Sequence, residues 1–475
     1  MTEREPERAP LADRGTFVPT EDGLATRDPL DFEGYADGVR AAAERSGVDE
    51  SVVTGRATIG GHAVELAQFS FEFFGGSMGE VTGERIARAI ERAASDRIPF
   101  VLHTRTGGAR MQEGMRSLIQ MAKITAARTE LGRAAVPFIA VLGHPTTGGV
   151  LASIAALADV TVAESDATIG FAGPRVAERF TGEPLPPDSH TAVSAFGHGL
   201  VDEVVTPGDA PSFVSRVLTT VSADDPRDVD VLPETIEDDR DAWDVVTAAR
   251  SEAHAKASEL LPNACDSFVE LRGDRGGADD PAVMSAVVRI AGRRAVVVAL
   301  DRAHPIGPHG YRKARRCLAV ARRLHLPFVT LIDTRGADPS ARSESDGVAW
   351  EIAATFDALL ASTVPIASIV TGEGGSGGAL ALAAGDVLLA FRDSFFSVIG
   401  PEGAAEILWR DADRAAEAAR ALALRAVDLK RLGVVDAVLD VDLGPRSLGL
   451  AIAGALDAVA SRGDPDARRA RWRNR

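Results

Sequence analysis

Cysteine is almost absent from this chain of 475 residues: only Cys265 and Cys317 occur, far apart and outside any C-x-x-C. Two such thiols exclude a disulfide framework and a four-cysteine zinc ribbon. Histidine is sparse as well, with nine residues that show no metal-ligand spacing. We therefore expect no metal site, and we interpret both cysteines as packing residues.

Long apolar runs and an excess of positive charge are also missing. No segment approaches the ~20 apolar residues that a membrane-spanning helix needs. The N-terminal sequence MTEREPERAPLADRG lacks the apolar centre of a secretion signal. A net charge of −17 argues against the basic surface by which proteins bind nucleic acids. We expect a cytoplasmic protein that binds neither membranes nor nucleic acid.

The side-chain arrangements of nucleophilic catalysis and of ATP binding are absent too. The sequence has no G-x-S-x-G elbow and no G-x-x-x-x-G-K loop. His144 precedes one loop and His309 another, but a lone histidine is usually structural. The remaining possibility is chemistry that depends on backbone stabilisation of a developing oxyanion.

What the chain does contain is one loop pattern that occurs twice. The interval from Gly107 to the pair Gly148-Gly149 equals the interval from Gly336 to the pair Gly377-Gly378. Further landmarks recur at nearly the same offset between the halves: Pro99-Phe100 with Pro327-Phe328, Asp159 with Asp386, and Gly173-Pro174 with Gly400-Pro401. This repetition predicts an internal duplication, that is, two domains of one fold in which Gly148 corresponds to Gly377.

The length and the patterning agree with two domains. A chain of 475 residues exceeds what one hydrophobic core usually supports. The charged, proline-rich residues 1–30 predict a disordered tail. Residues 223–241 hold nine acidic residues and two prolines and are typical of a linker. The domains would then span 31–222 and 242–475, and their alternating strand and helix patterns predict parallel α/β sheets.

A long helix is predicted from Gln112 to Leu131 in the first domain. Apolar residues recur there at helical spacing, and we interpret this face as core. Its members are Met111, Met115, Leu118, Ile119, Ala122 and Ala126.

The glycine pairs have a clear physical use where a strand leads into a helix. The first N–H groups of a helix have no helical acceptor, and the helix dipole adds positive potential there. Such a start binds an anion or an oxygen that becomes negative during reaction. A tight turn without a ligand is the other interpretation of any single pair, and the matched sets favour the functional one.

A second interpretation concerns Gly372 to Gly377, which satisfies G-x-G-x-x-G, the dinucleotide fingerprint. That fingerprint normally opens the first βαβ unit of a domain, whereas this one lies deep inside its half. The matching segment Pro145-Thr146-Thr147-Gly148-Gly149 has no such pattern. We therefore disfavour a nucleotide fold.

Longer motifs around these loops resemble a known family. In the first half, the segments resemble the carboxyltransferase β subunit of bacterial acetyl-CoA carboxylase: Phe74-Gly75-Gly76-Ser77-Met78-Gly79-Glu80-Val81, Thr106 to Gly114, Pro145 to Val150, and Ile169 to Gly173. In the second half they resemble its α subunit: Glu270 to Arg275, Asp279 to Ala282, His309-Gly310-Tyr311-Arg312-Lys313-Ala314, Gly372 to Gly378, and Pro401-Glu402-Gly403. The chain is similar to a β–α fusion without the zinc ribbon.

The resemblance implies two tandem crotonase-type domains, the β-type (31–222) on the acyl-CoA side and the α-type (242–475) on the biotin side. It implies transfer of carboxyl from carboxybiotin to the α-carbon of acetyl-CoA, which gives malonyl-CoA for fatty acid biosynthesis. No Met-Lys-Met sequence is present, so biotin must arrive on a biotin carboxyl carrier protein, loaded by a biotin carboxylase subunit. A homodimer or a larger stack of dimers is implied, because the two substrates meet between the β-type half of one chain and the α-type half of another.

The family's roles, carried over by motif, assign catalysis to two backbone oxyanion holes. Gly148 and Gly149 would serve the thioester oxygen, and Gly378 and Ala379 the biotin ureido oxygen. The substrate-binding candidates are Gly107, Gly108, Gly336, Gly377 and Arg110. For Arg110 a CoA contact and a salt bridge that holds the loop are equally open.

Alternatives from the same fold and from another class stay open. Propionyl-CoA or a longer acyl-CoA is the first, since Arg335 stands where the family commonly has Pro and Gly400 where it often has Ser. Decarboxylase subunits for malonyl or methylmalonyl thioesters share the glycine loops and are the second. A non-catalytic scaffold is the third, and intact glycine pairs in both halves disfavour it.

Overall fold

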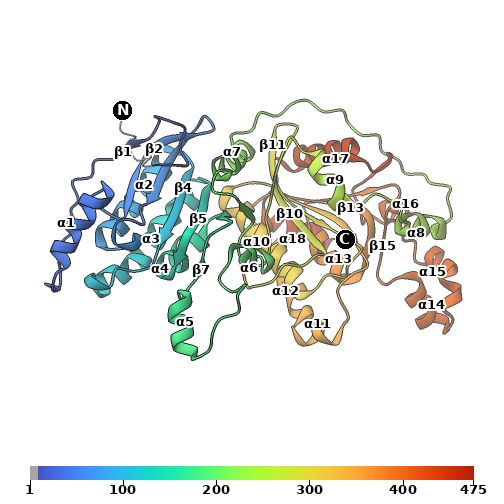
Figure 1. Cartoon of the computed structure of the whole chain (residues 1–475). Coiled ribbons are helices and arrows are strands. Elements are labelled where there is room, and N and C mark those ends of the chain that lie inside the picture. Colours follow the sequence, from blue (N-terminus) through green and yellow to red (C-terminus); the bar gives the residue numbers. More distant parts are fainter. Residues whose placement is uncertain (1–8, 475) are drawn as a thin grey trace. The chain divides into compact units, whose positions relative to one another are not determined.

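The computed structural model describes residues 9–474, and the chain divides into two compact units, 1–219 and 220–475. Figure 1 shows both units as sheets with helices packed on them. Each unit is built on a sheet of eight strands. No helix in the described part of the chain is both long and apolar enough to cross a membrane.

Unit 1 begins with short elements and then alternates strands with helices. Its strands are β1 (Val18–Pro19), β2 (Val52–Ile59), β3 (His62–Phe69), β4 (Phe100–Thr106), β5 (Phe138–Thr147), β6 (Val160–Glu164), β7 (Ile169–Gly170) and β8 (Glu203–Val205). Its helices are α1 (Tyr35–Ser46), α2 (Glu80–Asp96), α3 (Met115–Arg133), α4 (Gly148–Ser153), α5 (Pro174–Thr181), α6 (Ala192–Gly197) and α7 (Ala210–Val221), the last of which crosses the boundary between the units.

Unit 2 repeats the scheme with more helices. Its strands are β9 (Ser267–Glu270), β10 (Val283–Ile290), β11 (Arg293–Leu300), β12 (Phe328–Thr334), β13 (Ile366–Gly375), β14 (Val387–Phe391), β15 (Phe395–Ser397) and β16 (Ala437–Leu439). Its helices are α8 (Ala242–Arg250), α9 (Ala257–Ala264), α10 (Pro308–Leu324), α11 (Ala341–Ser345), α12 (Val348–Leu360), α13 (Ser376–Ala383), α14 (Pro401–Trp409), α15 (Ala415–Ala421), α16 (Ala426–Arg431), α17 (Pro445–Val459) and α18 (Pro465–Arg473).

The two sheets share one topology. In unit 1 an antiparallel hairpin, β2–β3, is followed by parallel β4, β5, β6 and β8, with β7 beside β5. In unit 2 the hairpin β10–β11 is followed by parallel β12, β13, β14 and β16, with β15 beside β13. The same order of strands in both units agrees with the duplication that the spacing of the glycines predicts.

The central strands are buried almost throughout and begin with apolar residues, as expected for parallel strands that are covered on both faces. In unit 1, Phe100 and Phe138 are adjacent on neighbouring strands and are fully buried. In unit 2, Phe328 pairs with Ile366 at the same place in the sheet. These residues begin the strands whose far ends carry the glycine loops, so the core fixes where the loops lie.

The expected disordered tail, 1–30, needs correction over the part that the structure describes; residues 1–8 lie outside it. Leu11 is buried, and the carboxylate of Asp13 accepts hydrogen bonds from the N–H groups of Gly60 and Gly61. Asp22 forms an ion pair with Arg85 of α2. Composition predicted disorder because the segment is charged, but several of these charges have partners in unit 1.

The acidic segment 223–241 runs along unit 2. Asp224 forms an ion pair with Arg294, and Asp238 and Asp393 both pair with Arg240. The backbone of Thr235 donates to the carbonyl of Val438 in β16. The segment predicted as a linker therefore contacts the rest of unit 2 through charged side chains and a backbone hydrogen bond.

Candidate active site

In unit 1 the two glycine loops lie against each other where parallel strands end. Gly107 and Gly108 follow β4, and Gly148 begins α4 directly after β5. Gly108 and Gly148 have φ angles of 111° and 68°, a region that favours glycine. A Cβ on Gly148 would lie 2.8 Å from the Cα of Gly108. The sequence needs glycine at both positions because the backbones touch.

Unit 2 repeats this contact. Gly336 follows β12 with a φ angle of 117°, and a Cβ there would lie 3.0 Å from the carbonyl oxygen of Gly375. The N–H of Gly336 donates to the hydroxyl of Thr334 at 3.1 Å, as that of Gly108 donates to Thr106 at 3.0 Å. The two loops are thus the same turn, held by the same side-chain bond.

The strand register corrects one expectation about the duplication. Thr106 lies opposite Thr146 in unit 1, and Thr334 lies opposite Gly374 in unit 2. By this register Gly148 corresponds to Ser376, not to Gly377, and Ser376 is also the first residue of its helix, with a φ angle of 59°. Gly149 then corresponds to Gly377. The two units share a first helical residue with a positive φ angle, whether or not that residue is glycine.

The hydrogen bonds distinguish among the predicted oxyanion donors of unit 1. The N–H of Gly148 donates to the carbonyl of Phe171 at 2.9 Å, so it is not free to bind a substrate oxygen. Gly149 and Val150 follow the N-cap residue Thr147 by two and three positions. In the first turn no helical carbonyl is available to accept their N–H groups. The available donors of α4 are Gly149 and Val150.

The same reasoning applies to α13, whose N-cap is Gly375. No helical carbonyl is available to accept the N–H groups of Ser376, Gly377 and Gly378. Ala379 is four residues beyond the cap, and in a regular helix its N–H donates to the carbonyl of Gly375. Gly377 and Gly378 correspond by register to Gly149 and Val150. The arrangement favours these matched pairs over the predicted pair Gly378 and Ala379.

Arg110 is buried, and its contacts fit the loop-holding interpretation rather than a CoA contact. Its guanidinium forms an ion pair with Glu50, contacts Glu113 at 3.3 Å, and donates to the carbonyl of Ser77 at 2.7 Å. The hydroxyl of Tyr35 donates to Glu113 at 2.5 Å. Although burial opposes it, Arg110 holds the pKa of Glu50 below its usual value. This network fixes the loop that follows Gly108.

Unit 2 uses a different buried pair beneath its loop. Asp333 of β12 is buried, forms an ion pair with Arg302, and accepts the N–H of Glu373 at 3.0 Å. Burial raises the pKa of Asp333 in spite of the neighbouring Arg302. Arg250 binds both oxygens of Glu373, at 2.9 and 2.7 Å. These contacts hold the end of β13, from which α13 begins.

Tyr311 of α10 lies directly beside Gly378. A Cβ on Gly378 would lie 2.7 Å from the Tyr311 hydroxyl and 2.6 Å from the N–H nitrogen of Ala337. Among the described residues this buried hydroxyl has no hydrogen-bond partner, and burial raises the pKa of Tyr311. Gly378 is therefore enclosed, whereas Gly377 has open space where a Cβ would stand.

The fingerprint Gly372 to Gly377 has a structural explanation that involves no dinucleotide. These residues form the end of β13 and the start of α13, in the middle of the sheet between β12 and β14. A Cβ on Gly372 would lie 2.3 Å from the carboxylate of Asp333, and one on Gly374 would lie 2.3 Å from the Phe396 ring. Neighbouring side chains occupy the space that these glycines leave.

The apolar face predicted for α3 does not pack in the core, which corrects the interpretation given above; the helix packs there through Ile124, Ala127 and Leu131. Met111 and Met115 are 84 % and 65 % exposed, and Ile119 is 54 % exposed. Periodicity identifies a face of a helix but not what covers it. Phe180 of α5 in unit 1 and Trp350 of α12 in unit 2 are also exposed.

Sequence reasoning missed several contributors to the site. The carbonyl of Phe171, the Arg302–Asp333 pair and the Tyr311 hydroxyl all involve residues far along the chain from those they contact. Phe171 and Tyr311 belonged to motifs that the resemblance singled out, but neither residue was assigned a role, and Arg302 and Asp333 belonged to none of these motifs. Within the described residues, no group of three His, Cys, Asp or Glu is arranged to hold a metal ion.

Comparisons with known proteins identify the family of this chain. A family model described as acetyl co-enzyme A carboxylase carboxyltransferase-like matches residues 227–447. The acetyl-coenzyme A carboxylase carboxyl transferase subunits beta/alpha of Salinispora tropica are 43 % identical over 91 % of this chain and 81 % of the relative. The corresponding protein of Clostridium tetani is 37 % identical over 90 % of this chain and 77 % of the relative. The chain belongs to the biotin-dependent acyl-CoA carboxyltransferase family.

Other similar proteins carry broader names. A probable biotin-dependent acyl-coenzyme A carboxylase beta3 subunit of Mycobacterium bovis is 38 % identical over 91 % of this chain and 88 % of the relative. The solved transcarboxylase 12S hexamer, with methylmalonyl-coenzyme A bound, has a TM-score of 0.77 at 24 % identity and covers 95 % of this chain and 89 % of that chain.

A solved single-chain, multi-domain long-chain acyl-CoA carboxylase has a TM-score of 0.73 at 22 % identity, over 94 % of this chain and 46 % of that chain. With the transcarboxylase, it shows the fold: two tandem crotonase-type domains.

Proposed function

We propose that this acyl-CoA carboxyltransferase moves the carboxyl group of carboxybiotin, carried on a separate biotin carboxyl carrier protein, to the α-carbon of acetyl-CoA. The observation that carries the proposal is the pair of matched helix starts, one in each unit, with free N–H donors beside a glycine contact. Transfer between two carbonyl-containing substrates develops negative charge on two oxygens, and each unit offers one set of donors.

The donors are assigned by unit. The start of α4, at Gly149 and Val150, binds the thioester oxygen, and the start of α13, at Gly377 and Gly378, binds the ureido oxygen of biotin. Gly107 and Gly377 support this assignment because a Cβ on either would meet no atom closer than 3.6 Å. Packing does not require glycine at these two positions, whereas close approach of a substrate does.

Acetyl-CoA is the proposed acceptor because relatives at 37–43 % identity carry the name of acetyl-CoA carboxylase. Propionyl-CoA is the alternative, favoured by the acyl-CoA name of the mycobacterial relative. With carboxylated carrier protein, we expect kcat/KM for acetyl-CoA to exceed that for propionyl-CoA by about 10–200-fold, the usual effect of one methylene in a fitted pocket. Equal or faster carboxylation of propionyl-CoA would contradict the proposal that acetyl-CoA is the preferred acceptor.

We further propose that two chains share each active site. The exposed apolar face of α3 and the exposed Trp350 are surfaces that a second copy would cover. A two-fold pair uses one self-complementary interface and would set the α4 loop of one chain opposite the α13 loop of its partner. A biotin carboxylase subunit that reloads the carrier completes the proposed set of partners.

Mixing two inactive variants tests this sharing. In a dimer of a Gly149→Val chain with a Gly378→Val chain, one of the two shared sites has both loops intact. Random pairing of equal amounts is expected to restore about a quarter of wild-type activity, because half of the dimers are mixed. The readout is malonyl-CoA formation, with native mass spectrometry to count mixed dimers. No recovery in a sample that contains mixed dimers would mean that each chain builds its own site.

A further inference from the structure

A pocket in unit 2 lies at the amino ends of the central strands, the end of the sheet opposite the glycine loops. It has a volume of about 640 Å³, and its lining includes Arg293, Pro327 and Pro365. Arg293 begins β11, and the two prolines directly precede β12 and β13, so all three lie at the amino ends of these strands. Gly336 lies just after β12 and Gly375 ends β13, so these glycines lie at the carboxyl ends of the same two strands. Strand β12 has seven residues, which at about 3.3 Å each place the pocket about 20 Å from the glycine loops.

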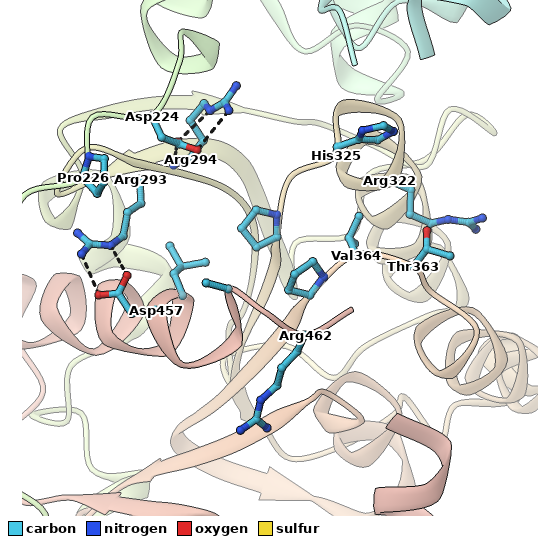
Figure 2. Close-up of a pocket in the computed structure, with 14 residues that line it drawn as sticks. Asp224, Pro226, Arg293, Arg294, Arg322, His325, Thr363, Val364, Asp457 and Arg462 are labelled. Atoms are coloured by element: carbon cyan, nitrogen blue, oxygen red, sulfur yellow. Dashed lines mark hydrogen bonds and ion pairs between the residues drawn. The ribbon is translucent and has the colours of Figure 1, made fainter. Parts of the chain in front are cut away.

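Cations outnumber carboxylates in this pocket, although the whole chain has a net charge of −17. The lining has four arginines and two aspartates, so two positive charges are left over, and the exposed His325 adds a titratable group. Arg293 is paired with Asp457 and Arg294 with Asp224. Figure 2 shows both pairs, with Arg322 and His325 across the pocket from Arg293.

The unpaired cations are Arg322 and Arg462. Within residues 9–474, no hydrogen bond or ion pair engages the Arg322 guanidinium, and Arg462 donates only to the carbonyl of Asp386, at 2.8 Å. Arg322 lies near the C-terminus of α10, and the carbonyls at a helix C-terminus also attract cations. Two of these carbonyls are already bonded, because that of Arg322 accepts the N–H of His325 and that of Ala321 accepts the N–H of Leu326. The guanidinium groups therefore keep free N–H donors.

The floor between these cations is apolar. Pro226, Pro327 and Pro365 line it together with Val364, Leu456 and Ala460. Figure 2 shows the side chains of Arg322 and Arg462 extending from the rim away from the pocket centre. Both residues are exposed, and exposed side chains change rotamer within nanoseconds, so either is free to turn toward a bound anion.

We propose that this pocket binds a nucleoside phosphate. Arginine matches phosphate oxygens with paired N–H donors, and one phosphate carries about −1.5 to −2 charges at pH 7, close to the excess of the pocket. A flat, largely apolar base would cover the proline-lined floor, which an inorganic anion would leave bare. The volume lies within the ~300–1,000 Å³ of small-molecule sites. This site is independent of the proposed carboxyl transfer.

The test is calorimetric titration of the full chain with ADP in the presence of saturating acetyl-CoA, which removes binding at any CoA site. We expect one ADP per chain. The double variant R322Q/R462Q should weaken ADP binding by at least about tenfold, because charge-assisted hydrogen bonds are lost. Ala460→Trp should abolish binding by filling the pocket from an exposed position. Arg446→Gln, an exposed arginine of α17 that does not line the pocket, should leave binding unchanged.

Adenosine and inorganic pyrophosphate separate the two halves of the proposal, and each should bind at least about tenfold more weakly than ADP. Pyrophosphate that binds as tightly as ADP would overturn the assignment to a nucleoside phosphate. So would the absence of saturable ADP binding below about 1 mM. ADP binding that survives both pocket variants, or that Arg446→Gln weakens equally, would overturn the site itself.

Discussion

Replacing Gly378 by Val is expected to lower the rate of carboxyl transfer by about 10²–10³-fold, the usual loss when one oxyanion donor is removed. The new Cβ would lie 2.6 Å from the Ala337 nitrogen and 2.7 Å from the Tyr311 hydroxyl, so the start of α13 must shift. Gly149→Val is expected to act similarly in unit 1, where the Cβ would lie 3.0 Å from the sulfur of Met121. The measurement is malonyl-CoA formation at saturating substrates.

A matched control separates this effect from misfolding. Gly454→Val adds the same side chain to an exposed helical glycine of unit 2 with open space around it. We expect this variant to keep its rate, and circular dichroism to show that all three variants are folded. Turnover within about threefold of wild type in both loop variants, against the ~10²–10³-fold loss expected, would remove these helix starts from the mechanism.

Replacing Arg110 by Met is expected to destabilise unit 1 by about 3–5 kcal/mol, because it leaves buried carboxylates without their cation. Glu50 and Glu113 are both buried, and although burial opposes it, Arg110 contributes most to the lowered pKa of Glu50. Urea unfolding measures the free-energy change. Hydrogen exchange assigns it to unit 1, since a protein of two units need not unfold in one step.

The control for this prediction is Arg116→Met. Arg116 forms an ion pair with Glu80, but both side chains are largely exposed, so the loss should not exceed about 1 kcal/mol. Equal destabilisation by the two substitutions would show that the Arg110 network contributes no more than a surface pair. It would also reopen a direct substrate role for Arg110.

The sequence predicted the strands and loops that build the site because their signals are local. The apolar runs at Phe100, Phe138 and Phe328 each begin a strand, and the glycines that follow mark its turn. Strand β13 is longer than its apolar pattern, which stops at Thr371, because Gly372 to Gly375 remain in the sheet. Their missing side chains make room for Asp333 and Phe396, a reason that only the fold supplies.

The donors within each helix start were less predictable. The glycine pairs in the sequence indicated that Gly148 and Gly377 are equivalent. The strand register instead aligns Gly148 with Ser376, which also has a positive φ angle at the start of its helix. The N–H of Gly148 is taken by the carbonyl of Phe171, which lies beyond α4 and β6 in the sequence. Nothing in the local sequence indicates which N–H group a distant carbonyl takes.

Arg110 and the α3 face illustrate two further limits. The partner of Arg110, Glu50, is 60 residues away in the sequence, so a motif cannot distinguish a buried ion pair from a substrate contact. The face with Met111 and Met115 has the periodicity of a core helix but is exposed in one chain. Periodicity shows that a surface requires burial; it does not show whether the same chain provides it.

The reverse reaction tests the central claim most directly. Purified chain is incubated with malonyl-CoA labelled in the free carboxyl group, with and without biocytin, and without ATP. We expect acetyl-CoA and labelled carboxybiocytin to form together, in equal amounts, only when biocytin is present. Release of label at the same rate without biocytin would identify a thioester decarboxylase and contradict carboxyl transfer between two matched oxyanion sites.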